Sequence, residues 1–186
     1  MYMLTERTDW TADEAQQLPD DGNRYEVIDG MLLMTPSPNN DHQDAVARLH
    51  RILWDYLQVE KIGYAAISPS DVRFSEWRAV QPDVFVTGLV DGRRPRNWNN
   101  IKQVLLASEV LSPSTARTDR TIKRNMFQSV GVEYWVVDLT ARTFERSMPN
   151  SNRTEIFVGK IEWMPAGASM PLTIDIADFF AKVLDQ

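Results

Sequence analysis

The chain has 186 residues, of which 43% are hydrophobic and 10% aromatic, and this composition excludes wholesale disorder and fits one domain, residues 1–186, with a buried core. It has no cysteine, which excludes disulfides and thiolate zinc sites and suits a reducing compartment. The formal net charge of −6, from 26 acidic and 20 basic residues, argues against a broad surface that coats nucleic acid.

The N-terminal part of the chain predicts a short helix and then a hairpin. The first residues, "MYMLTERTDW", lack the apolar core of a signal peptide, and no apolar run reaches membrane-spanning length. We therefore expect a cytoplasmic protein with no membrane partner. Thr11 and Glu14 form a capping-box signature at the start of a helix in residues 11–18. Residues 24–35, "RYEVIDGMLLMT", are two strand patterns about Asp29-Gly30, a two-residue hairpin signal.

A long helix and three short strands are predicted next. Between Asp41 and Lys61, apolar residues recur at spacings of three and four and form one stripe, with Gly63 as the terminator. The segments "YAAI", "DVRFS" and "AVQPDVFV" have strand composition. Residues 87–100 form a loop that is long for a compact domain, a feature that often means function or mobility.

The second half of the chain predicts a strand–helix–strand unit. The apolar run "QVLLASEVL", residues 103–111, is typical of a strand buried on both faces. "SPST" caps a helix over 116–130 that Gly131 ends, and "EYWVVDL", residues 133–139, is another buried strand. This order predicts a right-handed crossover in a mixed sheet. Two or three more strands and the helix "DIADFFAKVL", capped by Asp175, complete an α/β domain with a central sheet.

Two acidic residues stand in otherwise apolar strand segments, Asp83 in "QPDVFV" and Glu109 in "ASEVLSPST". Burying a carboxylate is costly unless a cation compensates it, and two carboxylates in one cleft favour protonation unless a cation is present. Mg²⁺ and Mn²⁺ prefer oxygen ligands and are often held by one or two carboxylates together with phosphate oxygens of a substrate. Asp119 and Lys123, four residues apart on the next helix, could complete a site for metal-assisted phosphodiester hydrolysis.

Each of these residues also has a structural interpretation. An acid at a strand end can be a cap or an arginine partner, and Asp119 with Lys123 can be an exposed helix ion pair worth on the order of a few tenths of a kcal/mol. Glu26 is either a third acid of the cluster or a surface residue on an edge strand, and the sequence alone favours the second. His42, at the start of the long helix, is either a phosphate contact or a cap, whereas His50 faces the apolar stripe as a structural residue.

The charge of the chain is unevenly distributed. Residues 93–124 carry eight basic residues against two acidic ones, and the segment is either a solvated basic face or a surface that faces phosphates.

Other catalytic classes lack their sequence signatures. Two histidines and no cysteine are a poor basis for a zinc hydrolase, and the chain has no G-x-S-x-G, P-loop or G-x-G-x-x-G motif.

Seven ordered motifs carry a resemblance to a known family. They are "RYEVIDG", "HQDAVARL", "DVRF", "VQPDVFV", "SEVLSPST", "DRTIK" and "GVEYWVVD". Together they resemble a bacterial family of restriction-endonuclease-like proteins in the PD-(D/E)XK nuclease superfamily, and the resemblance runs from about Leu4 to Phe180. The resemblance implies a restriction-endonuclease-like core of the α/β (α+β) class, a central mixed sheet flanked by helices, and a divalent-metal nuclease site.

The resemblance assigns roles to individual residues. Pro82-Asp83 matches the "PD" element and Glu109 the acid of (D/E)XK, but the lysine expected two residues later is Leu111. In this family the lysine looks to have moved to the following helix. The matching residue here is Lys123. The resemblance also implies that Glu26, an N-terminal glutamate, supports the metal. Further matched positions are His42-Gln43 and Asp119, and Phe127 stands where the family usually has tyrosine.

The leading hypothesis is a metal-dependent endonuclease that acts on nucleic acid, expected to be DNA. In this hypothesis Asp83 and Glu109 bind Mg²⁺ or Mn²⁺ with Glu26 as an outer ligand or a ligand of a second metal, and Lys123 positions or activates the attacking water. The expected phosphate contacts are His42, Arg117, Arg120 and Arg124, with Gln81 and Asp119 as supporting residues. A homodimer is expected, because two sites can cut two strands. Two alternatives stay open: a catalytically silent nucleic-acid-binding or assembly module on the same fold, and a metal-dependent hydrolase of a small phosphorylated substrate.

Overall fold

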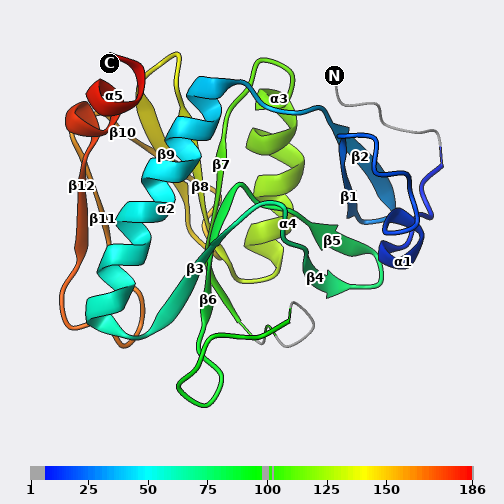
Figure 1. Ribbon diagram of the computed structural model, residues 1–186, viewed down its shortest axis with the longest axis horizontal. Helices are drawn as coiled ribbons and strands as arrows, with labels where there is room; N and C mark the ends of the chain where they lie inside the picture. Colours follow the sequence, from blue (N-terminus) through cyan, green and yellow to red (C-terminus); the bar gives the residue numbers. More distant parts are fainter. Residues whose placement is uncertain (1–6, 98–100, 102, 186) are drawn as a thin grey trace.

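A six-stranded sheet forms the centre of the computed structural model, which describes residues 7–97, 101 and 103–185 (Figure 1). Its strands are β3 (Gly63–Ile67), β6 (Val84–Gly88), β7 (Val104–Val110), β8 (Glu133–Asp138), β9 (Thr143–Ser147) and β10 (Thr154–Phe157). They lie in the order β10-β9-β8-β7-β6-β3. The central β7–β8 pair is parallel and the other pairs are antiparallel, so the predicted mixed sheet is confirmed.

The two parallel strands are joined by a helical connection, as the strand–helix–strand pattern predicts. Three consecutive segments make up this connection: α3 (Ala116–Thr118), the π-helix η2 (Asp119–Lys123) and α4 (Arg124–Ser129). The sequence predicted one regular helix here and gave no sign of the π turn. Gly131 follows with φ of +77°, a left-handed conformation that favours glycine and ends the helix at the predicted place.

A second sheet, of four strands, packs beside the central one. Its strands are β1 (Arg24–Ile28), β2 (Met31–Thr35), β4 (Val72–Ser75) and β5 (Arg78–Val80), in the order β2-β1-β5-β4. The predicted hairpin between β1 and β2 is confirmed, with positive φ at both Asp29 and Gly30. The short helix α1 (Ala12–Ala15) precedes this sheet and begins at the predicted capping box.

The segment "AVQPDVFV" corrects one prediction, because it is not a single strand. Its first residues end β5 in the second sheet and its last residues form β6 in the central sheet. Gln81-Pro82-Asp83 crosses between the two sheets, and Pro82 has no N–H to give to a ladder of strand hydrogen bonds. Asp83 therefore lies at the junction of the two sheets.

Helices cover both faces of the central sheet. On one face lie α2 (Asn40–Glu60) and α5 (Ile176–Leu184), which share a core with the hairpin of β11 (Lys160–Trp163) and β12 (Leu172–Asp175) (Figure 1). The opposite face is covered by α4 and the four-stranded sheet, around a core that includes Phe85 and Phe127. The tail thus holds four strands, more than the sequence predicted. Within the described part of the chain, no helix has both the length and the apolarity needed to cross a membrane.

The ends of the two longest helices test two local predictions. Asp175 caps α5 as predicted, because its carboxylate accepts a hydrogen bond from the Asp178 N–H. Gly63 does not terminate α2. The helix ends at Lys61, whose φ is +54°, and Gly63 begins β3, where a Cβ atom would lie 2.7 Å from the carbonyl oxygen of Thr87.

Candidate functional site

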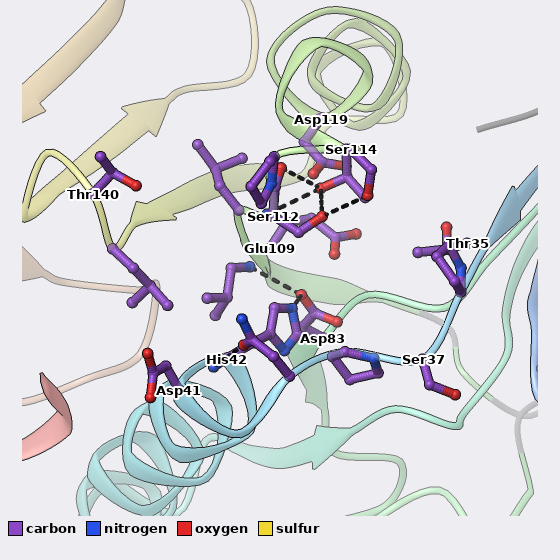
Figure 2. A pocket seen from close by; sticks show the side chains of 18 of the residues that line it. Thr35, Ser37, Asp41, His42, Asp83, Glu109, Ser112, Ser114, Asp119 and Thr140 are labelled. Carbon is purple, nitrogen blue, oxygen red and sulfur yellow. Dashed lines mark hydrogen bonds and ion pairs between the residues drawn. The ribbon is translucent and has the colours of Figure 1, made fainter. Parts of the chain in front are cut away.

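A cavity of about 440 Å³ opens where the start of α2, the end of β7 and the π-helix meet (Figure 2). Asp83 and Glu109 both line it. The antiparallel strands β6 and β7 bring them together, because Val84 pairs with Ser108. Asp83 precedes Val84 and Glu109 follows Ser108, so the two acids lie next to each other. The two acids that stood out in the sequence therefore face one cavity.

Asp83 is held by three donors. Its Oδ1 accepts a hydrogen bond from Arg24 Nη1 at 2.7 Å, and its Oδ2 lies 3.0 Å from His42 Nε2 and 2.9 Å from the Val110 backbone nitrogen. Burial by itself would raise the pKa of Asp83. The His42 hydrogen bond and the positive charge of Arg24 outweigh burial, so that the pKa lies well below its usual range. Asp83 is consequently a fixed, ionised carboxylate.

Lys123 is the cation of the other half of the site. Its Nζ lies 2.7 Å from Glu109 Oε1 and 2.8 Å from Glu26 Oε2, and 3.9 Å from Asp119 Oδ1. All four side chains are buried. Burial raises the pKa of Glu109 well above its usual value, the ammonium of Lys123 opposes this, and the neighbouring acids raise it further. Burial also raises the pKa of Asp119, to about 6, against the effects of Lys123 and of a hydrogen bond from Thr115.

Two structural interpretations of the sequence are wrong. Glu26 is not on an edge strand, because β1 lies between β2 and β5, and the side chain is fully buried with Oε1 accepting the Gln81 N–H at 2.8 Å. Asp119 and Lys123 are not an exposed ion pair. Both are buried, since they lie in the π-helix, on the side that faces the site.

The charge balance of the site suits a cation. Four carboxylates, those of Glu26, Asp83, Glu109 and Asp119, surround two fixed cations, Arg24 and Lys123, which gives a net charge of −2 when every acid is ionised. Asp119 Oδ1 is buried and accepts no hydrogen bond from any described residue. Hard divalent cations prefer such oxygen donors, so the chemistry of the donor set fits one. Among the described residues, however, no group of three or more His, Asp or Glu side chains is arranged to hold a metal ion. In this arrangement Lys123 and Arg24 contact the carboxylates.

Comparison with known proteins identifies the family of the chain. The model of the Uma2 family, described as "Putative restriction endonuclease", matches residues 12–176. The chain belongs to the Uma2 family. The restriction-endonuclease-like family inferred from the motifs is thereby confirmed.

A solved structure shows that the fold is shared as well. A crystal structure described as "a putative nuclease belonging to DUF820 from Anabaena variabilis" has a TM-score of 0.77 to this Uma2 chain. The two sequences are 22% identical over 94% of this chain and 99% of the other. A search of curated proteins found no match.

The remaining predicted residues of this Uma2 member lie in different places. His42 is buried against Asp83, whereas Gln81 donates a side-chain hydrogen bond to Asp71 at 2.8 Å. The three arginines predicted to contact phosphates, Arg117, Arg120 and Arg124, do not line the carboxylate cavity. Arg120 instead bonds Asp138 and Glu145, Arg124 bonds Thr154, and Arg117 is exposed.

Two features of the site were missed in the sequence. The first is Arg24, the counterion of Asp83, which stands two residues before Glu26. Residues at this spacing point to the same side of a strand, so the pair "R-Y-E" was a signal that the sequence offered. The second is a group of hydroxyls in the segment after β7, which also lines the cavity. There Ser112 Oγ lies 3.0 Å from Ser114 Oγ and 3.1 Å from Thr115 Oγ1 (Figure 2).

Proposed function

We propose that this chain is a metal-dependent endonuclease that hydrolyses phosphodiester bonds in nucleic acid, with DNA as the expected substrate. The observation that carries the proposal is that Asp83 and Glu109 line one cavity, while Lys123, from a third segment, contacts Glu109 at 2.7 Å from behind the lining. Membership in a family described as "Putative restriction endonuclease", and the fold shared with the structure described as "a putative nuclease", support a nuclease-like function.

Asp83 and Glu109 would hold a divalent cation, Mg²⁺ or Mn²⁺. Glu26, which contacts Lys123, would be an outer ligand of this cation. Such an ion, when bound, polarises a phosphoryl oxygen and makes water a better nucleophile. Arg24 and His42 keep Asp83 ionised, which favours binding of a cation. With every acid ionised, the net charge of the site is −2, which is the charge that one divalent ion neutralises.

Lys123 would act on the water and the phosphate. Its ammonium is fixed by two carboxylates, at 2.7 Å from Glu109 and 2.8 Å from Glu26, so that a phosphate held at Glu109 would have this positive charge close by. Leu111 takes the position of the usual lysine and packs in the core instead. The proposal therefore requires Lys123 to carry this role.

A cleavage assay tests the proposal. Labelled single- and double-stranded DNA is incubated with the protein and Mg²⁺ or Mn²⁺, and a small phosphodiester is assayed in parallel to test the alternative of a hydrolase of a small phosphorylated substrate. We expect Glu109→Gln and Lys123→Met to lower cutting by at least about 10²-fold, because they remove groups that act in the transition state. Glu133→Gln, which makes the same change on neighbouring β8, is the matched control. Unchanged cutting by folded Asp83→Ala and Lys123→Ala would remove these residues from the mechanism.

The second candidate is a catalytically silent module, and one observation favours it. Both oxygens of Asp83 already accept hydrogen bonds from the protein, so a metal must compete with Arg24 for this carboxylate. Thermal unfolding with Mn²⁺ separates the two functions. An ion at 100 times its Kd stabilises the fold by about 2.7 kcal/mol, and for the endonuclease this gain should vanish in Glu109→Ala. A silent module, whether it binds nucleic acid or serves in assembly, should show neither cutting nor a gain with Mn²⁺.

A further inference from the structure

A second cavity, of about 360 Å³, lies directly beside the carboxylate site. Four residues line both cavities and form the wall between them: Arg24, Ser37, Pro38 and Asp83. A ligand that is held at Asp83 therefore has the second cavity next to it.

The lining of the second cavity combines flat apolar surfaces with amide groups. Pro38, Val46 and Pro69 supply the apolar surfaces. Two side-chain amides, those of Asn23 and Gln43, also line the cavity; the Gln43 amide makes no side-chain hydrogen bond with any described residue, whereas the Asn23 amide interacts with Asp21 and Tyr25 at the rim. Each amide offers both a donor and an acceptor, so this cavity can recognise a planar ligand by its faces and by its polar edge.

The walls of the second cavity are connected to one another by hydrogen bonds. Ser37 Oγ donates to the carbonyl oxygen of Gly22 at 2.9 Å, and Arg24 Nη1 donates to Ser68 Oγ at 3.3 Å. These bonds join three segments that are far apart in the sequence. The cavity is therefore formed before any ligand arrives, as is usual for small-molecule sites.

Charge decides which part of a nucleotide the second cavity suits. Asp20 lines it, and a carboxylate repels a phosphate but accepts a hydrogen bond from the amino group of a base. Arg24 lies in the shared wall, and its Nε is buried without a hydrogen-bond partner among the described residues. Guanidinium groups bind phosphate well. The phosphate is therefore expected at the wall and the base beyond it.

We propose that the second cavity is a nucleobase subsite, which takes the base of the nucleotide adjacent to the phosphodiester bond at Asp83. Asn23 and Gln43 bond the edge of the base, while Pro38 and Pro69 contact its faces. A base that is paired and stacked in a duplex cannot enter a cavity, so the subsite selects a single strand or an extruded nucleotide. This inference rests on the proposed function and names the form of its substrate.

Binding of free nucleotides tests the subsite without any cleavage. Saturation-transfer NMR is recorded on the metal-free full chain with each of the four deoxynucleoside monophosphates, and with deoxyribose 5-phosphate. We expect saturation of base protons with the nucleotides and at least a fivefold loss of this signal in Asn23→Ala/Gln43→Ala. The matched control is Gln17→Ala/Asn152→Ala, which removes two exposed amides elsewhere and should keep the full signal.

Two outcomes would overturn the subsite: base protons without saturation in the wild type, or equal signals from the wild type and Asn23→Ala/Gln43→Ala. These outcomes differ from failure of the proposed function. A protein that cuts DNA but shows no contact with bases refutes the subsite alone. A protein that binds bases through Asn23 and Gln43 but never cuts refutes the endonuclease and supports the subsite.

Discussion

The two halves of the carboxylate site hold their acids in opposite ways. Asp83 is one acid with three donors, namely Arg24, His42 and the Val110 N–H. On the other side three acids share the single ammonium of Lys123. The pKa of Asp83 is accordingly lowered, whereas the pKa of Glu109 is raised.

The difference indicates that the halves have different tasks. Asp83 is fully compensated, so it adds to the stability of the fold and keeps one geometry. The Glu109 half has three buried acids for one ammonium, so ionising all three costs stability until a further cation arrives. Neutralising an acid should therefore have opposite effects in the two halves.

The largest effect is expected when the shared cation is removed. Lys123→Met leaves Glu26, Glu109 and Asp119 buried without a counterion, and we expect the free energy of unfolding at pH 7 to fall by about 3–5 kcal/mol. Urea denaturation followed by circular dichroism measures this. Lys182→Met, which breaks an exposed pair with Asp178, is the control and should cost less than about 1 kcal/mol. Equal losses in the two variants would contradict the buried-cation role.

Neutralising one acid in each half tests the comparison directly. Asp83→Asn should lower the free energy of unfolding by about 2–3 kcal/mol, because Arg24 loses its charged partner. Glu109→Gln should change it by less than about 1 kcal/mol or raise it, because one of three crowded charges is removed. The same urea titration in EDTA measures both variants. A loss in Glu109→Gln as large as that in Asp83→Asn would show that the two halves are equivalent.

The pH dependence of the free energy of unfolding should reveal the cost of burying ionised acids in the Glu109 half. The pKa of Asp119 is about 6 in the fold against 3.8 for the free group, so the folded state binds the proton more tightly. The resulting stabilisation is complete below about pH 4 and is lost as the pH rises through about 6. Between pH 4 and 7 the wild type should thus lose about 2–3 kcal/mol relative to Asp119→Asn. Parallel stability curves, measured in EDTA, would contradict the raised pKa.

The smallest effect is expected at the cap of α2, which positions the Asp83 half. Asn39 Oδ1 accepts the backbone N–H of His42 at 3.0 Å. Asn39→Ala should cost about 1 kcal/mol and shift the NMR signals of the His42 ring, while signals of the Lys123 side chain stay in place. Shifts confined to Lys123 would mean that the cap does not position this half.

Much of the fold could be predicted because its signals are local. The capping box at Thr11 and Glu14, the turn at Asp29-Gly30 and the cap at Asp175 each depend on a few neighbouring residues. The π turn and the division of "AVQPDVFV" between two sheets depend on distant partners instead. Apolar periodicity alone does not report such partners.

The candidate site followed the same rule. Asp83 and Glu109 could be singled out because an acid inside an apolar strand is locally unusual. Glu26 lies in an ordinary alternating strand, and it is buried because β5 and Lys123 cover it in the folded chain. Arg24 escaped notice because its partner, Asp83, is 59 residues away.

The π turn has a consequence for how related sequences should be aligned. A π turn holds one residue more than the α-helical turn it replaces, so it behaves as a one-residue insertion. Met126 and Phe127 in the next turn are anchored in the core, so any change in length must be absorbed before them. Relatives that lack the extra residue would carry their lysine one position away from Lys123 in an alignment. A search for this nuclease-type lysine should therefore allow its column to slide by one residue.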